Sequence, residues 1–154
     1  MSIISIEILD VGSGIIGEGN IRLEGGNIFH VDVDRRAFHV EVICDIHHLP
    51  FIDCCFGVVY AGHVLEHVDS PSKAVEELKR ISKKWVIVKV PNASWYKFMT
   101  DPEETPDHIY SWNSWTFRNL MRKYFLHVEI KSTIRRLANQ KQSKIRTLKL
   151  MLLI

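Results

Sequence analysis

Asp10-Val11-Gly12-Ser13-Gly14 follows an apolar run, Ile3 to Leu9, that is rich in isoleucine. The run predicts a buried strand, because short apolar runs that end at turn-forming residues are typical of one. The glycines after it predict a tight loop in which no side chain blocks the approach of a ligand. We therefore expect a ligand site directly after the first strand.

A second feature of this stretch is its spacing relative to residues further on. Gly12, Gly14 and Gly17 form a G-x-G-x-x-G pattern, and Asp32 lies 20 residues after Gly12. In dinucleotide-binding proteins an acid at that spacing binds ribose hydroxyls. A nicotinamide-dependent oxidoreductase is therefore one candidate from these residues alone.

The remainder of the chain alternates predicted strands with predicted helices. Further strands are expected at 28–33, 40–44, 56–61, 85–90, 125–132 and 147–154. Ser70-Pro71 predicts the start of a helix whose apolar stripe comprises Ala74, Val75, Leu78 and Ile81. A second helix is expected at 115–124, with Trp115, Leu120, Met121 and Tyr124 buried. This alternation predicts βαβ units and an α/β fold with a mainly parallel sheet.

Composition favours one globular domain spanning residues 1–154, since 46% of the residues are hydrophobic and 25% are charged. The longest apolar runs are far shorter than the roughly 20 residues that span a bilayer. No charged segment precedes the N-terminal apolar run, so no secretory signal is predicted. We expect no membrane association and a cytoplasmic location.

The cysteines indicate neither a disulfide-bonded protein nor a zinc protein. Cys44, Cys54 and Cys55 fit no disulfide framework. With His47 and His48 they could bind zinc, but the spacing matches no regular pattern, and no metal is predicted.

Charge is unevenly distributed along the chain. Residues 1–117 hold 10 Lys and Arg against 17 Asp and Glu, whereas 118–154 hold 10 against 1. This basic C-terminal segment (118–154) is either a solvated face or a surface for nucleic acid, an acidic substrate or another subunit, including a second copy of the chain.

Three segments taken together resemble those of a known family, the class I S-adenosylmethionine-dependent methyltransferases. The matching segments are the D-x-G-x-G loop at Asp10 to Gly14, an L-P-F segment at Leu49-Pro50-Phe51 and an L-E-H segment at Leu65-Glu66-His67. In that family an acid stands at the end of the first strand, as Asp10 does, whereas dehydrogenases usually have an apolar residue there. Ile16, in place of a third glycine, departs from the pattern.

The resemblance implies a single Rossmann-like domain with about seven strands, the last one antiparallel, helices on both faces and some truncated crossovers. It implies S-adenosylmethionine as the cofactor, with Asp32 on the ribose, Asp45 and Ile46 around the adenine, and the segment containing His63 beneath the methionine moiety. The implied cofactor-binding set is Asp10, Gly12, Ser13, Gly14, Asp32, Val33, Asp45, Ile46 and His63.

His63 and His108 are the candidate catalytic residues, since an imidazole can act as a general base near neutral pH. The predicted reaction is methyl transfer to an O, N or C nucleophile of an unknown acceptor. Lys89-Val90-Pro91-Asn92 lacks the N-P-P-Y arrangement that related enzymes use on flipped bases, so a small molecule, sugar or protein is favoured over a DNA base. A further alternative is a non-catalytic module that binds nucleic acid or a partner through the basic C-terminal segment.

Overall fold

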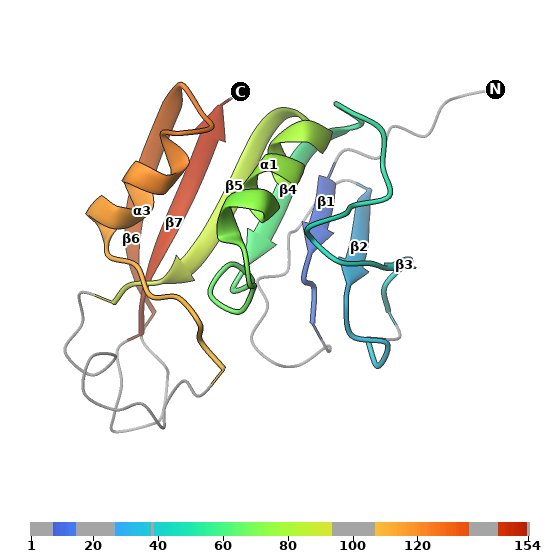
Figure 1. Cartoon of the computed structure of the whole chain (residues 1–154), viewed down its shortest axis with the longest axis horizontal. Coiled ribbons are helices and arrows are strands. Elements are labelled where there is room, and N and C mark those ends of the chain that lie inside the picture. The colour runs from blue at the N-terminus through green and yellow to red at the C-terminus, as the bar shows by residue number, and fades with distance from the viewer. Residues whose placement is uncertain (1–7, 15–26, 38, 94–106, 136–144, 154) are drawn as a thin grey trace.

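The computed structural model describes residues 8–14, 27–37, 39–93, 107–135 and 145–153 (Figure 1). In this part of the chain seven strands form one sheet in the order β3-β2-β1-β4-β5-β7-β6. The strands are β1 (Ile8–Val11), β2 (Ile28–Asp32), β3 (Val42–Ile43), β4 (Phe56–Gly62), β5 (Ser82–Pro91), β6 (His127–Arg135) and β7 (Ile145–Leu153). The helices are α1 (Pro71–Ile81) and α3 (Ser114–Met121).

The strands β3, β2, β1, β4 and β5 are parallel to one another. On β1, Leu9 pairs in register with Val59 of β4, and Val11 pairs with Ala61; all four side chains are buried. Alternation along the strand turns Asp10 toward the opposite face of the sheet. The mainly parallel α/β fold expected from the sequence is confirmed. The predicted strand residues before Ile8 lie outside the described residues.

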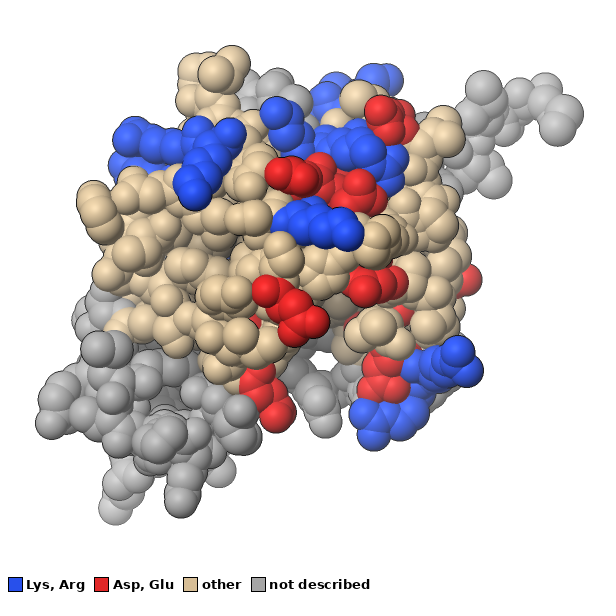
Figure 2. All heavy atoms as spheres, viewed as in Figure 1, with Lys and Arg blue, Asp and Glu red and all other residues tan. Residues whose placement is uncertain are grey.

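The strand β7 lies between β5 and β6 and runs antiparallel to both. This pairing places the C-terminal strands beside the parallel part of the sheet. Figure 2 shows one group of Lys and Arg side chains over the end of the molecule where α3 and β6 lie, and further groups elsewhere on the same face. The side chains of the basic C-terminal segment beyond Lys131 lie outside the described residues.

Helix α1 begins as the sequence predicts. The Ser70 hydroxyl accepts a hydrogen bond from the Lys73 backbone N–H, and Pro71 occupies the first helical turn. The predicted stripe of Ala74, Val75, Leu78 and Ile81 is fully buried against the sheet. Burying each of the three larger side chains contributes about 1.5–3 kcal/mol. The predicted buried face is confirmed.

Helix α3 is capped by Asn113, whose side chain accepts hydrogen bonds from the backbone N–H groups of Trp115 and Thr116. The helix buries Phe117 and Met121, one turn apart, against the core. Trp115 lies about 200° around the helix from Phe117 and is 70% exposed. The prediction that Trp115 is buried is wrong, because Phe117 takes the core-facing position.

Both described helices cover the same face of the sheet (Figure 1) and share one core with it. The chain moves from β4 to β5 and on to β6 across the sheet, and right-handed crossovers in that direction put their helices on one face. The other face is where the connections after β1 and β2 would pass. The connection at 33–41 is too short for a helix and forms turns in its described residues, and 15–26 lies outside them. Helices on both faces are therefore not found in the described part of the chain.

Neither α1 nor α3 is long and apolar enough to cross a membrane.

Candidate functional site

A pocket of about 410 Å³ opens at the carboxyl ends of β1, β2 and β4. The chain leaves β1 toward β2 on one side and later reaches β4 on the other, so the pocket lies at the switch point where open α/β sheets bind ligands. Its volume falls in the range of roughly 300–1,000 Å³ that is usual for small-molecule sites. It is lined by Val11, Gly12, Gly14, Asp32, Val33, Cys44, Asp45, Ile46, His47, His63, Val64, His67, Val68 and Asp69.

The loop after β1 forms one wall of this pocket. Gly12 and Gly14 have φ angles of 71° and 68°, a conformation that favours glycine. The Gly12 N–H donates to the carbonyl of Val31 at 2.9 Å, which holds the loop against β2. A Cβ atom at Gly12 would overlap the side chain of Val64. The loop can therefore follow this path only if position 12 carries no side chain.

Asp32, at the end of β2, fixes the same loop. Its Oδ2 accepts a hydrogen bond from Gly14 N at 2.7 Å, and its Oδ1 accepts one from Asp34 N at 2.8 Å. A carboxylate has about four lone-pair positions, so two remain after these bonds. Asp32 lines the pocket although the residue is only 8% exposed. The arrangement suits a ligand with two adjacent hydroxyl donors, such as a ribose diol.

The segment after β3 forms a further part of the pocket wall. Asp45 accepts hydrogen bonds from His47 N at 2.9 Å and His47 Nδ1 at 2.7 Å, and the bond to the His47 amide lowers the pKa of Asp45. The second ring nitrogen, Nε2, is buried and has no hydrogen-bond partner within the described residues. With Nδ1 protonated toward Asp45, this Nε2 can accept a hydrogen bond from a ligand amine. Ile46 packs mainly into the core and exposes only 5% of its surface.

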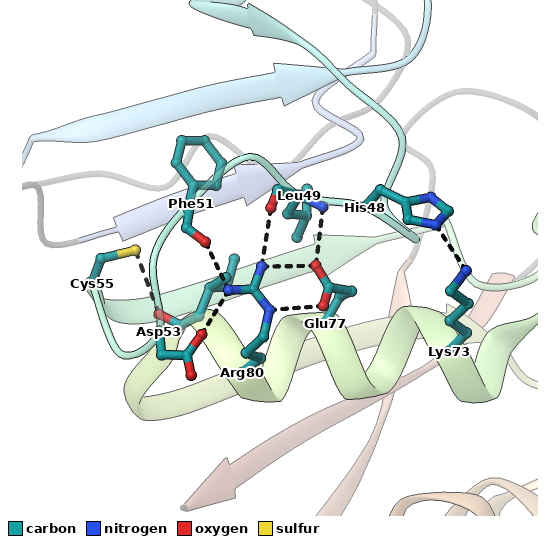
Figure 3. Close-up of polar contacts among 9 residues, drawn as sticks. His48, Leu49, Phe51, Asp53, Cys55, Lys73, Glu77 and Arg80 are labelled. Atoms are coloured by element: carbon teal, nitrogen blue, oxygen red, sulfur yellow. Dashed lines mark hydrogen bonds and ion pairs between the residues drawn. The ribbon is translucent and has the colours of Figure 1, made fainter.

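Arg80 on α1 anchors the chain that follows this wall (Figure 3). Its guanidinium donates to the carbonyls of Phe51 at 2.7 Å and Leu49 at 3.0 Å, and to Asp53 at 2.8 Å. Glu77, one turn earlier on α1, binds Arg80 and also accepts from Leu49 N at 3.0 Å. Hydrogen bonding to Glu77 is the main reason that the pKa of Arg80 is raised. The L-P-F segment is thereby held to the helix through its main chain.

Asp10 does not line the pocket. Its Oδ2 lies 3.2 Å from Nδ1 of His30, and it is paired in register with Tyr60 on the face of the sheet away from α1 and α3. Burial raises the pKa of Asp10, and burial likewise raises the pKa of Tyr60 to about 12. The acid of the D-x-G-x-G loop therefore precedes the lining residue Val11 and contacts His30 instead of entering the pocket.

His63 enters the pocket from the turn after β4. Its φ is 60°, an uncommon value for a residue with a side chain, and its N–H donates to Lys89 O at 2.8 Å. Its Nδ1 lies 3.1 Å from Oε1 of Glu66, which is fully buried. Because an ionised carboxylate only accepts, Nδ1 is the donor and Nε2 keeps its lone pair. This is the orientation of a general base held by a carboxylate.

The segment at 107–112 is joined to the same turn. The backbone N–H groups of Ile109 and Tyr110 both donate to Glu66 O, at 2.8 Å and 3.1 Å. The rings of His67 and His108 pack edge to face with centroids 4.7 Å apart, and burial lowers the pKa of His108. His108 thus lies next to the turn that carries His63, although it is not part of the pocket lining.

Seven of the residues predicted for the site meet at the pocket: Gly12, Gly14, Asp32, Val33, Asp45, Ile46 and His63. Asp10, Ser13 and His108 do not line it. The sequence predicted neither His47 nor His67 as a cofactor-binding residue, although His47 directly follows Ile46 and His67 ends the L-E-H segment. Of the aromatic residues after β5, Trp112 is buried in the core, and Trp95, Tyr96 and Phe98 lie outside the described residues.

Comparison with known families assigns this architecture. The family described as "Methyltransferase domain" matches residues 9–88, more than half of the chain. The chain belongs to this methyltransferase family. The class I S-adenosylmethionine-dependent methyltransferase that the sequence resembles is confirmed, and the nicotinamide-dependent oxidoreductase finds no support. No curated protein sequence matches the chain.

Solved structures share the methyltransferase fold at low sequence identity. An S-adenosylmethionine-dependent methyltransferase from Thermotoga maritima, described as a possible histamine N-methyltransferase, is 16% identical with a TM-score of 0.70, over 96% of this chain and 81% of that one. A methyltransferase from Archaeoglobus fulgidus is 15% identical with a TM-score of 0.71, over 96% and 86%. One from Haloferax volcanii, solved in complex with the Trm112 activator, is 18% identical with a TM-score of 0.68, over 97% and 82%.

Proposed function

We propose that this methyltransferase binds S-adenosylmethionine in the pocket at the ends of β1, β2 and β4, and transfers its methyl group to an acceptor beside His63. The observation that carries the proposal is the convergence of the glycine loop, Asp32 and the Asp45 to His47 segment on one pocket. When bound, the cofactor supplies a methyl group already activated by the sulfonium. The chain itself then has to position the acceptor and remove a proton where the nucleophile carries one.

The polar groups of the pocket fit this cofactor. The two remaining acceptor positions of Asp32 suit the ribose hydroxyls, and charge-assisted hydrogen bonds of this kind are the strong ones. The buried Nε2 of His47 suits the exocyclic amine of adenine, with Asp45 and Ile46 on the same wall. The open backbone at Gly12 and Gly14 leaves room for the methionine tail. Asp10 pairs with His30 and does not line the pocket, so we do not assign it to the tail.

His63 is the base that this arrangement favours. Glu66 holds Nδ1 of His63, so Nε2 is left to accept a proton from a hydroxyl or amine of the acceptor. The side chain of His63 is 35% exposed, so an acceptor can reach it. For His108, which packs against His67, we propose a contact with the acceptor rather than the role of base. We favour a small molecule, a sugar or a protein side chain as the acceptor, because the segment after β5 lacks the N-P-P-Y arrangement.

Ligand-dependent melting separates the methyltransferase from the dinucleotide alternative. S-adenosylhomocysteine should raise the melting temperature, and above its Kd the rise should follow the logarithm of its concentration; NADH should leave the melting temperature unchanged, because only a ligand that binds the folded state stabilises it. The reverse result would overturn the proposal.

The role of His63 needs an activity readout. With labelled S-adenosylmethionine and a panel of hydroxyl and amine acceptors, His63→Gln should lower turnover about 10²–10⁴-fold, as the loss of a general base does. The affinity for S-adenosylhomocysteine should change much less. Turnover equal to that of the wild type would remove His63 from this role.

A further inference from the structure

The turn after β4 and the segment 107–110 bring together three potential metal ligands. One carboxylate oxygen of Glu66 and one ring nitrogen each of His67 and His108 lie within 4.8 Å of one another. These residues come from two segments about 40 positions apart. The two backbone hydrogen bonds to the Glu66 carbonyl hold the segments together without using any of the three side chains.

One of the two carboxylate oxygens of Glu66 lacks a hydrogen-bond partner among the described residues. The residue is fully buried, and Oε1 is taken by Nδ1 of His63 at 3.1 Å. Its other oxygen, Oε2, is buried and has no hydrogen-bond partner in the described part of the chain. Buried polar atoms are almost always bonded, so an unpaired carboxylate oxygen requires an explanation such as an ion.

His67 is oriented as metal-binding histidines are. Its Nδ1 lies 3.0 Å from the backbone carbonyl of Asp107, which can only accept, so Nδ1 carries the proton. The lone pair is therefore on Nε2. Metal-binding histidines usually donate their other ring nitrogen to a carbonyl or carboxylate in this way, which fixes both the tautomer and the ring.

We propose that Glu66, His67 and His108 bind a divalent ion of the zinc class. One carboxylate and two imidazoles are the protein ligands of known catalytic zinc sites, which leave a further position open. Imidazole ligands also favour zinc, cobalt or iron over magnesium and calcium, which prefer oxygen ligands. Bonds of about 2.1 Å in a tetrahedral site would draw the ligand atoms to about 3.4 Å from one another, so the three side chains would have to move slightly closer together when the ion binds.

The proposed metal site lies next to the pocket and to His63, where an ion could take part in the reaction. His67 belongs both to the cluster and to the lining of the pocket, and Glu66 is shared with His63. An ion here would lie beside the proposed base, with its open position available to an acceptor oxygen and able to lower the pKa of a hydroxyl. This last step rests on the proposed function; the binding of the ion does not.

Cobalt(II) titration of the metal-free protein, without cofactor and without a polyhistidine tag, tests the proposal. We expect one ion per chain with visible d–d absorption and displacement by zinc. Since no cysteine is a ligand, the intense near-ultraviolet absorption of cobalt–thiolate bonds should be absent. A thiolate band would instead indicate Cys44, Cys54 or Cys55 and overturn the assignment, as would the failure of the wild type to bind cobalt or zinc.

Variants identify the ligands. Losing an outer-shell partner typically lowers metal affinity about 10–100-fold, so His67→Gln and His108→Gln should each lower it about a hundredfold or more. His48→Gln is the matched control: His48 is exposed, contacts Lys73 and lies outside the cluster. Wild-type affinity in both cluster variants would overturn the proposal.

Folding and cofactor binding are followed separately. Circular dichroism shows whether each variant folds. If a variant does not, zinc should protect His67 and His108 of the wild type from a histidine-modifying reagent while His48 still reacts, and equal reaction at all three would refute the site. S-adenosylhomocysteine affinity is measured in the metal-free protein, so failure of the metal site and failure of the proposed function are distinguishable.

Discussion

Asp32→Asn tests the cofactor site at the side chain that connects its parts. Asparagine keeps one oxygen that can accept from Asp34 N at the position of Oδ1. At the position of Oδ2 it places an NH₂ group opposite Gly14 N, where 2.7 Å now separates donor from acceptor. Two donors cannot share that distance, so the loop bond is lost, and the ligand loses an acceptor for one ribose hydroxyl.

The expected effect follows from these two bonds. A hydrogen bond to a charged group contributes about 1.5–3 kcal/mol. The loop bond is present without ligand, so its loss lowers the stability of the folded protein, whereas the loss of the ribose bond acts on binding. Since about 1.4 kcal/mol corresponds to a factor of ten, the Kd for S-adenosylhomocysteine should rise about 10–10²-fold. Isothermal titration calorimetry measures this directly, with circular dichroism to confirm that the variant is folded.

Asp34→Asn is the matched control. Asp34 is two residues further on, pairs with Arg36 at 2.6 Å and does not line the pocket. Its substitution should leave the Kd within about threefold, because exposed ion pairs contribute little. A folded Asp32→Asn protein with the affinity of the Asp34→Asn control would refute the assignment of Asp32 to the ribose.

Three further changes address the loop, the sheet and the anchor. Gly12→Ala should destabilise the protein by at least about 1–2 kcal/mol in urea unfolding, because alanine is disfavoured at this φ and overlaps Val64; unchanged stability would contradict the loop geometry. Burial raises the pKa of Tyr60 from 10.0 to about 12, so the folded state keeps the phenol neutral while the unfolded state ionises. The stability that the neutral Tyr60 phenol contributes is present below pH 10 and is lost as the pH rises toward 12. The unfolding free energy of Tyr60→Phe should therefore fall less steeply than that of the wild type between pH 10 and 12. Parallel curves for the two proteins would argue against this effect of burial. Arg80→Ala should lower stability by about 1–3 kcal/mol and weaken cofactor binding, since the Leu49 carbonyl loses a charged donor; calorimetry and urea unfolding check both.

The parts of the site that the sequence predicts are those held by local geometry. The glycine loop and Asp32 each end a strand, and parallel strands bring their carboxyl ends to one edge of the sheet. Asp45 follows a third strand, and the structure brings it to the same pocket. The start of helix α1 was also predictable, because the capping serine Ser70 and the proline Pro71 are adjacent in the sequence and act within the first turn.

The features of the site that the sequence did not predict depend on side-chain orientation and on contacts between residues far apart in the chain. Asp10 faces away from the helices because Leu9 and Val11 on either side of it are buried in the core and side chains alternate along a strand. The contact of His67 with Asp107 joins residues 40 positions apart, and no local pattern predicts which two segments will meet. Predicting that Trp115 is exposed would have required knowledge of which side of α3 faces the sheet.

The two hydrogen bonds from residues 109 and 110 to the Glu66 carbonyl have a consequence for redesign. Both are main-chain bonds, so they do not depend on which side chains occupy those positions. The side chains of Ile109 and Tyr110 are 57% and 38% exposed beside the turn that carries His63. The Tyr110 side chain also donates to the Asp69 carbonyl at 3.0 Å and stacks on Trp112, so it is best retained. Position 109 can be randomised to accommodate new acceptors while the scaffold that positions the reacting groups stays intact, which makes it the natural starting point for a library that seeks altered substrate range.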